Sequence, residues 1–164
     1  MSVLPLVFWP DPRLSQPCAP VGEADHEALV ADMFDTLYAA KGRGLAAPQV
    51  GVLRRIFVMD VGWKSGDPTP EAFLDPVITV REQRVDVLEE GCLSIPGLMV
   101  PVERPVAITL AWRDARGDMH MRDFDGFEAR CIQHEIDHLD GRITLDHLSS
   151  QDKAALLAEY KGPQ

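Results

Sequence analysis

Hydrophobic positions near the start of the chain follow the period of a helix. Between residues 25 and 42, apolar side chains recur every three or four positions, which places them on one helical face. These apolar residues are Leu29, Val30, Met33, Phe34, Leu37 and Tyr38. Asp25 suits the N-cap, Lys41 the last turn and Gly42 the end. The pattern therefore predicts a helix that buries one face.

The middle of the chain contains shorter apolar runs that predict strands. A loop rich in Gly and Pro at residues 62–70 separates the first strand from the others. A turn at residues 114–118, which contains Gly117, joins the last two strands. The predicted strands are 56–59, a pair formed by 74–80 and 84–88, and a second pair formed by 106–112 and 119–124.

Two further helices are predicted after these strands. One covers residues 126–139 and is ended by Gly141. The other begins at Ser149, which with Asp152 resembles a capping box, and continues to Tyr160. Helices that bracket a run of short strands favour an α+β fold with a mainly antiparallel sheet over alternating βαβ units.

Composition and charge narrow the class of protein. The 164 residues fit one domain, which we expect to span residues 1–164, and 46% hydrophobic residues suffice for a core without disulfides. The three cysteines give no disulfide framework. A net charge of −10 argues against direct nucleic-acid binding. The chain has no signal-peptide pattern and no apolar run of roughly 20 residues, so we expect a cytoplasmic protein without membrane contact.

The predicted second helix carries an H-E-x-x-H motif at residues 134–138. His134 and His138 are four positions apart, so they share one helical face and can converge on one metal ion. Glu135 could then reach a water molecule at that ion. The alternative is a solvated helix with two incidental histidines. Because two histidines leave a metal site incomplete, a third ligand must come from another segment.

Two residues could supply that third ligand. Cys92, within the sequence E-G-C-L-S at 90–94, would offer a thiolate, a strong ligand for zinc or ferrous iron. A free cysteine, however, is commonly a small buried hydrophobe, and we expect that role for Cys131. His147 is the only histidine after His138, and it would be the third ligand in a zincin-type endoprotease.

Residues 42–49 form a third notable segment, G-R-G-L-A-A-P-Q. Glycines allow a backbone to approach a ligand closely, and Gln49 could donate a side-chain N–H. Read by itself, this segment is better interpreted as a helix end followed by a loop.

Taken together, the three segments resemble the peptide deformylase family. That family carries G-x-G-L-A-A-P-Q, E-G-C-L-S and Q-H-E-x-D-H in this order, and the likeness runs from about residue 11 to residue 149. The resemblance implies a deformylase fold, in which mainly antiparallel strands surround a metal-binding helix. It also implies hydrolysis of the formyl group from the N-terminal formyl-methionine of new peptides, with release of formate.

The resemblance also implies roles for particular residues. Glu135 is expected to be the acid–base residue, Gln49 and the backbone N–H of Leu93 to hold the oxyanion, and Gly44 to contact the peptide. The metal ligands implied by the motifs are Cys92, His134 and His138. They would bind one divalent ion, usually ferrous iron in the family, though such sites also take zinc, nickel or cobalt. The implied partners are formylated peptide N-termini, including nascent chains at the ribosome.

Two segments depart from the family pattern. Arg43 stands where Val or Ile is usual, in a neighbourhood that lines the pocket for the substrate methionine, so it is a candidate substrate-binding residue. Residues 97–102 are apolar and lack a basic residue often found there. A second hypothesis is therefore a deformylase-like metal-binding protein with weak or altered activity that recognises peptide N-termini. The intact Glu135 and Gln49 favour the active enzyme.

Overall fold

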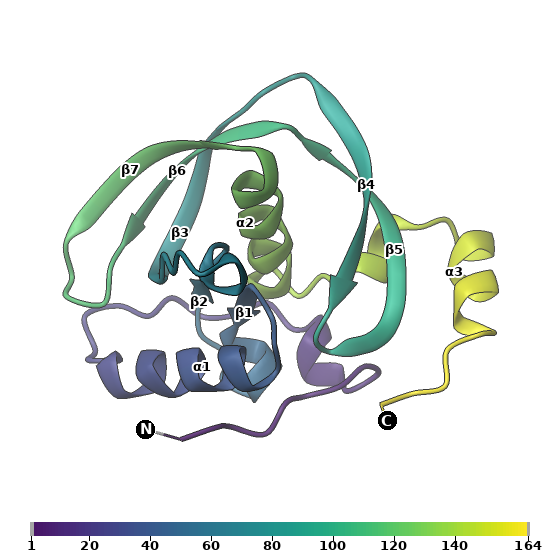
Figure 1. Cartoon of the computed structure of the whole chain (residues 1–164), viewed down its shortest axis with the longest axis horizontal. Coiled ribbons are helices and arrows are strands. Elements are labelled where there is room, and N and C mark those ends of the chain that lie inside the picture. Colours follow the sequence, from purple (N-terminus) through teal and green to yellow (C-terminus); the bar gives the residue numbers. More distant parts are fainter. Residues whose placement is uncertain (1, 164) are drawn as a thin grey trace.

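The computed structural model describes residues 2–163 of the chain. Its centre is helix α2 (Gly126–Leu139), which lies between a curved sheet and a two-stranded ribbon (Figure 1). The other helices are α1 (Glu27–Ala39) and α3 (Ser150–Leu157). The strands are β1 (Gly44–Ala46), β2 (Ile56–Met59), β3 (Glu71–Arg81), β4 (Val85–Cys92), β5 (Ile95–Pro105), β6 (Ala107–Arg113) and β7 (Met119–Asp125). This architecture confirms the predicted α+β class.

All strand pairs in the structure are antiparallel. The larger sheet has the order β1-β2-β3-β6-β7, and β4 and β5 form the separate ribbon. In Figure 1 the larger sheet curves around one side of α2, the ribbon passes on the other side, and α1 lies beneath. The side chains of α2 therefore pack against two separate sheets.

The predicted pairing of strands 74–80 and 84–88 is wrong. β3 pairs with β2 and β6, whereas β4 pairs with β5, a strand that the sequence pattern did not reveal. β5 contains Pro96, Pro101 and Pro105, and prolines normally argue against a strand. A ribbon of two strands has only edge strands, so an edge position without an N–H costs little there.

The ends of α1 also differ from the prediction. The N-cap residue is His26, while the carboxylate of Asp25 accepts a hydrogen bond from the backbone N–H of Glu27 at 2.9 Å. At the C-terminal end, Lys41 adopts the left-handed conformation with φ of 59°. Gly42 instead packs against Leu93, where an added Cβ atom would lie 2.8 Å from Cδ1 and would displace that side chain.

The other two helices agree more closely with the sequence pattern. α2 has the predicted bounds, and Gly141 follows it with φ of 75°. Ser149 caps α3, since its side chain accepts a hydrogen bond from the N–H of Asp152 at 3.1 Å. This last helix ends at Leu157, three residues earlier than expected.

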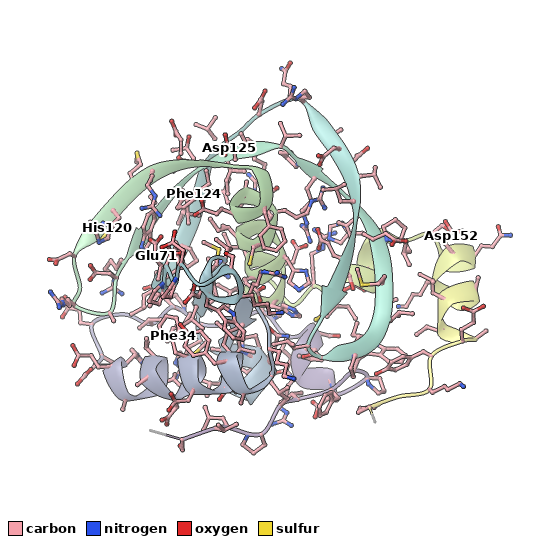
Figure 2. The ribbon with its side chains drawn as sticks, viewed as in Figure 1. Phe34, Glu71, His120, Phe124, Asp125 and Asp152 are labelled. Carbon is pink, nitrogen blue, oxygen red and sulfur yellow. The ribbon has the colours of Figure 1, made fainter. Side chains whose placement is uncertain are left out.

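Aromatic side chains fill the space between α2 and the larger sheet. The ring of Phe73 is fully buried, with its centroid 4.5 Å from Phe57 and 4.9 Å from Trp112. Trp112 also stacks on His120 and contacts Phe124, two residues of β7 that are labelled in Figure 2. Ten of the fourteen residues of α2 are buried, so this helix belongs to the core although it carries polar chemistry.

A buried carboxylate organises the predicted loop at 62–70. Asp60 is fully buried and accepts hydrogen bonds from the Tyr38 hydroxyl at 2.7 Å and from the backbone N–H groups of Trp63 and Thr69 at 3.1 and 2.9 Å. The loop is therefore fixed against the end of α1. In the described part of the chain, no helix has the length and apolar composition that a membrane crossing requires.

Candidate metal centre

Three side chains, one from β4 and two from α2, come close together. Cys92 ends β4, and His134 and His138 project from one face of α2. Each residue offers one ligand atom, and these atoms all lie within 4.8 Å of one another. The Sγ atom of Cys92 is 3.4 Å from Nε2 of His138. The structure thus brings together the three residues that the family motifs implied as ligands.

The chemistry of this donor set fits a divalent metal ion. Burial alone would raise the pKa of the Cys92 thiol, but the charges and hydrogen bonds of His138 and His134 outweigh it and hold that pKa well below its usual range. A cysteine thiolate with two imidazoles is a set that zinc or ferrous iron accepts. Cys131 has the opposite environment, where burial and the charge of Glu135 raise the pKa of its thiol.

Glu90 fixes the orientation of one histidine. Oε1 of Glu90 lies 2.9 Å from Nδ1 of His134, and because the carboxylate can only accept, Nδ1 carries the proton. The other ring nitrogen, Nε2, is then left for a metal ion. Burial alone would raise the pKa of Glu90, but hydrogen bonds from His134 and Arg104 overcome it and hold this pKa far below its usual range.

Two buried arginines neutralise Glu90. Nε of Arg104 donates to the carboxylate at 2.6 Å, and Nη1 of Arg130 donates to it at 2.6 Å as well. Nη1 of Arg104 also donates a hydrogen bond to the carboxylate of Asp137 at 3.0 Å. Asp137 in turn accepts a hydrogen bond from His147 at 2.7 Å. This network was not predicted from the sequence. It could not be, because Arg104 takes its inward position only in β5, a strand that the sequence pattern did not predict.

The network determines the positions of Asp137 and His147. Asp137 neither faces solvent nor contacts a ligand of the cluster, but pairs with Arg104 and His147. His147 is accordingly held by a carboxylate and does not belong to the cluster of possible metal ligands. The arrangement that a zincin-type endoprotease would need is absent from the described residues.

Glu135 is placed beside the cluster with one oxygen free of protein partners. The residue is only 3% exposed, and its Oε1 accepts no hydrogen bond from the described residues. Burial raises its pKa, an effect that the charges of His134 and His138 partly oppose. A carboxyl group with a raised pKa next to a set of possible metal ligands is suited to accept and return a proton.

Gly44 makes room for this carboxylate. A Cβ atom at residue 44 would lie 2.5 Å from Oε2 of Glu135 and 2.7 Å from Sγ of Cys131. No real side chain tolerates such distances, so β1 can approach α2 this closely only with glycine here. The preceding residue, Arg43, is exposed, and its guanidinium lies 5.5 Å from the centre of the Phe127 ring.

Gln49 reaches the cluster from the short 3-10 turn that follows β1. Its Oε1 accepts a hydrogen bond from the N–H of Ala46 at 3.0 Å, which fixes the amide. Nε2 consequently points toward the ribbon, 3.1 Å from Oγ of Ser94 and 3.6 Å from Sγ of Cys92. Leu93 lies in the turn between β4 and β5, between these two residues.

The fold and the cluster together correspond to the H-E-x-x-H class of proteins, with a cysteine beside the two histidines of the motif. Comparison with known proteins specifies the family: the model for polypeptide deformylase matches residues 3–154. The chain therefore belongs to the polypeptide deformylase family.

Individual relatives agree with this assignment. A peptide deformylase of Afipia carboxidovorans is 40% identical over 98% of this chain and 95% of its own length. Peptide deformylase 2 of Xanthomonas campestris is 44% identical over 91% of this chain and 89% of its own length. Among solved structures, Ehrlichia chaffeensis peptide deformylase in complex with actinonin has a TM-score of 0.91 at 40% identity, covering 98% of this chain and 97% of that one.

Proposed function

We propose that this chain is a metal-dependent hydrolase that removes the formyl group from the N-terminal formyl-methionine of newly synthesised peptides and releases formate. The observation that carries the proposal is the buried Glu135, which has one unpartnered oxygen and whose carboxyl interacts with the charges of His134 and His138 in the cluster. A buried carboxyl without a protein partner is costly, and such groups occur where catalysis requires them.

We assign the role of metal ligand to Cys92, His134 and His138. A divalent ion held by these residues would supply a Lewis acid that makes water a better nucleophile near neutral pH. Ferrous iron is the metal we expect, with zinc, nickel and cobalt as alternatives. Glu90 supports this role, because it holds His134 in the tautomer that leaves Nε2 free.

The remaining residues of the site would handle the proton and the developing charge. Glu135 accepts a proton from the attacking water and later delivers it to the leaving amine, so that the C–N bond breaks and formate is released. Nε2 of Gln49 and the backbone N–H of Leu93 donate to the oxyanion. Each donor of such a pair is worth roughly 10²–10³ in rate.

The substrate would approach along β1. Gly44 leaves its backbone close to Glu135, where an extended peptide could lie, and Arg43 borders the same path. Formylated peptide N-termini are the expected partners. Contact with nascent chains at the ribosome and a cytoplasmic location follow from that substrate as parts of the proposal.

A formyl-Met peptide assay with metal-loaded protein tests the proposal. The protein is loaded anaerobically with iron or with nickel, and formate release is measured for wild type and Glu135→Ala. We expect release by wild type and none by the variant, with equal metal content in both proteins. Wild type with a full metal complement that releases no formate would instead support a binding protein that recognises peptide N-termini.

A further inference from the structure

Three basic side chains lie on the two segments that meet next to Gly44, although the whole chain has a net charge of −10. We call Lys41, Arg43 and Lys64 the basic rim. Arg43 directly precedes Gly44, which adjoins the carboxylate of Glu135. Its guanidinium is exposed and lies over the Phe127 ring at 5.5 Å. A cation is therefore fixed one residue from the position where we expect the peptide to lie.

Backbone contacts hold the segments of the basic rim together. The N–H of Asp60 donates to the carbonyl of Arg43 at 2.8 Å. The indole N–H of Trp63 donates to the carbonyl of Gly42, also at 2.8 Å, and Nζ of Lys64 lies 5.7 Å from the centre of the Trp63 ring. The three cations thus belong to two segments, residues 41–43 and residues 60–64, that are joined by hydrogen bonds. These hydrogen bonds keep the cations close together.

The cations of the basic rim repel one another. Burial and the positive charges of Arg43 and Lys41 lower the pKa of Lys64, so the three groups are close enough to repel one another. Among the described residues, no carboxylate forms an ion pair with any of them. Glu71, an acidic residue of β3 labelled in Figure 2, is paired with Arg122 on β7 at 2.7 Å. Repulsion among unpaired cations would be relieved by a negatively charged partner.

We infer that the basic rim selects formylated peptides that carry aspartate or glutamate within the first few residues after the formylated one. This inference rests on the proposed function, because the formyl group must reach Glu135. An extended peptide advances about 3.3 Å per residue, so side chains two to four positions along pass the cations next to Gly44. The basic rim then acts on substrate choice and not on the bond-breaking step.

The inference is tested with matched formyl-Met peptides that differ at one position. Glutamate, glutamine or lysine is placed in turn at the second, third or fourth residue, and kcat and KM for formate release are measured. At one position or more we expect kcat/KM to be about three- to tenfold higher for glutamate than for lysine, from two or three partly exposed charge pairs. The preference should appear as a lower KM for the glutamate peptide. The ratio of the two kcat/KM values should approach one as salt is raised to about 1 M.

Variants of the rim identify its members. Arg43→Gln combined with Lys64→Gln should reduce the glutamate-to-lysine ratio to about one, and Arg43→Glu should invert it. Arg84→Gln, an exposed arginine in the connection between β3 and β4, is the matched control and should retain the wild-type ratio. A wild-type ratio near one at all three positions, or a ratio unchanged in the double variant, would overturn the inference while leaving the proposed function intact.

A binding measurement separates the two proposals. Fluorescently labelled formyl-Met peptides with glutamate or lysine are bound to the Glu135→Gln variant, and anisotropy gives Kd without turnover. If no peptide yields formate with the metal-loaded wild type, the proposed function fails, but tighter binding of the glutamate peptide would still support the basic rim. Equal Kd values for both peptides would contradict it.

Discussion

The carboxylate of Glu90 and the imidazole of His134 form a buried hydrogen bond of 2.9 Å, and the same carboxylate forms ion pairs with two arginines. Glu90, a residue of β4, therefore contacts both a histidine of the cluster and two buried arginines. It sets the tautomer of His134, and it joins α2 to the ribbon through Arg104 and Arg130. We therefore expect the stability of this region and its affinity for metal to be linked.

Replacement of Glu90 should reveal that link. In Glu90→Gln, Arg104 and Arg130 lose the buried carboxylate that they share and keep only Asp137 and Asp86 as ion-pair partners, which should lower the free energy of unfolding by about 3–5 kcal/mol. Metal affinity should fall by roughly 10–100-fold, since the orientation of His134 is no longer enforced. Urea denaturation and competition with a chelator measure the two effects. Glu89→Gln, whose side chain is exposed on the same strand, is the control and should change stability by no more than about 0.5 kcal/mol.

The two cysteines near the site should differ sharply in their effect on metal. Cys92→Ala removes a member of the cluster and should abolish stoichiometric metal binding, whereas Cys131→Ala removes a buried thiol with a raised pKa and should retain the metal. Elemental analysis after equilibrium dialysis provides the comparison. Full metal content in Cys92→Ala would show that another residue completes the donor set.

The sequence predicted those features of the site that depend on local spacing. His134, Glu135 and His138 share one turn of a helix whose bounds the apolar pattern predicted correctly. Cys92 lies 42 residues before His134 in the sequence, so only the family motifs connected it to the helix. The pairing of Glu90 with Arg104 depends on the register of β4 and β5, and the prolines of β5 concealed that strand.

The ends of α1 show a different reason for failure. A glycine after an apolar helical run usually marks the left-handed residue that ends a helix. Here Lys41 takes that conformation, and Gly42 is favoured because Leu93 of the β4–β5 turn packs against it. A contact between segments that are distant in sequence thus determined the residue, and the local pattern could not indicate it. The same holds for Gly44, whose neighbours belong to α2.

The stability of the protein should depend on Tyr38 at alkaline pH. Burial and the hydrogen bond to Asp60 raise the pKa of its hydroxyl above the ordinary value of about 10. Because the folded pKa is raised, the contribution to stability is complete below about pH 10 and is lost as pH rises through the folded pKa. Urea denaturation at pH 9 and pH 11 should therefore show a larger loss for wild type than for Tyr38→Phe. Equal losses would mean that Tyr38 ionises alike in both states.

The close approach of Gly44 to Glu135 gives the most direct test of how the proposed acid–base residue is placed. In Gly44→Ala the added Cβ would meet Oε2 of Glu135 at 2.5 Å and Sγ of Cys131 at 2.7 Å, so the carboxylate must move. A displacement of about 1 Å at a reacting group can cost roughly 100-fold in rate, and we expect kcat for formate release to fall by that order.

A second substitution shows whether the loss comes from crowding. Combining Gly44→Ala with Cys131→Ala removes one of the two contacts and should restore part of the activity, whereas Cys131→Ala alone should be nearly neutral for kcat. Metal content should be unchanged in all three variants, because none of them alters the cluster of Cys92, His134 and His138. If Gly44→Ala retained full kcat, the position of the Glu135 carboxylate would not limit the reaction.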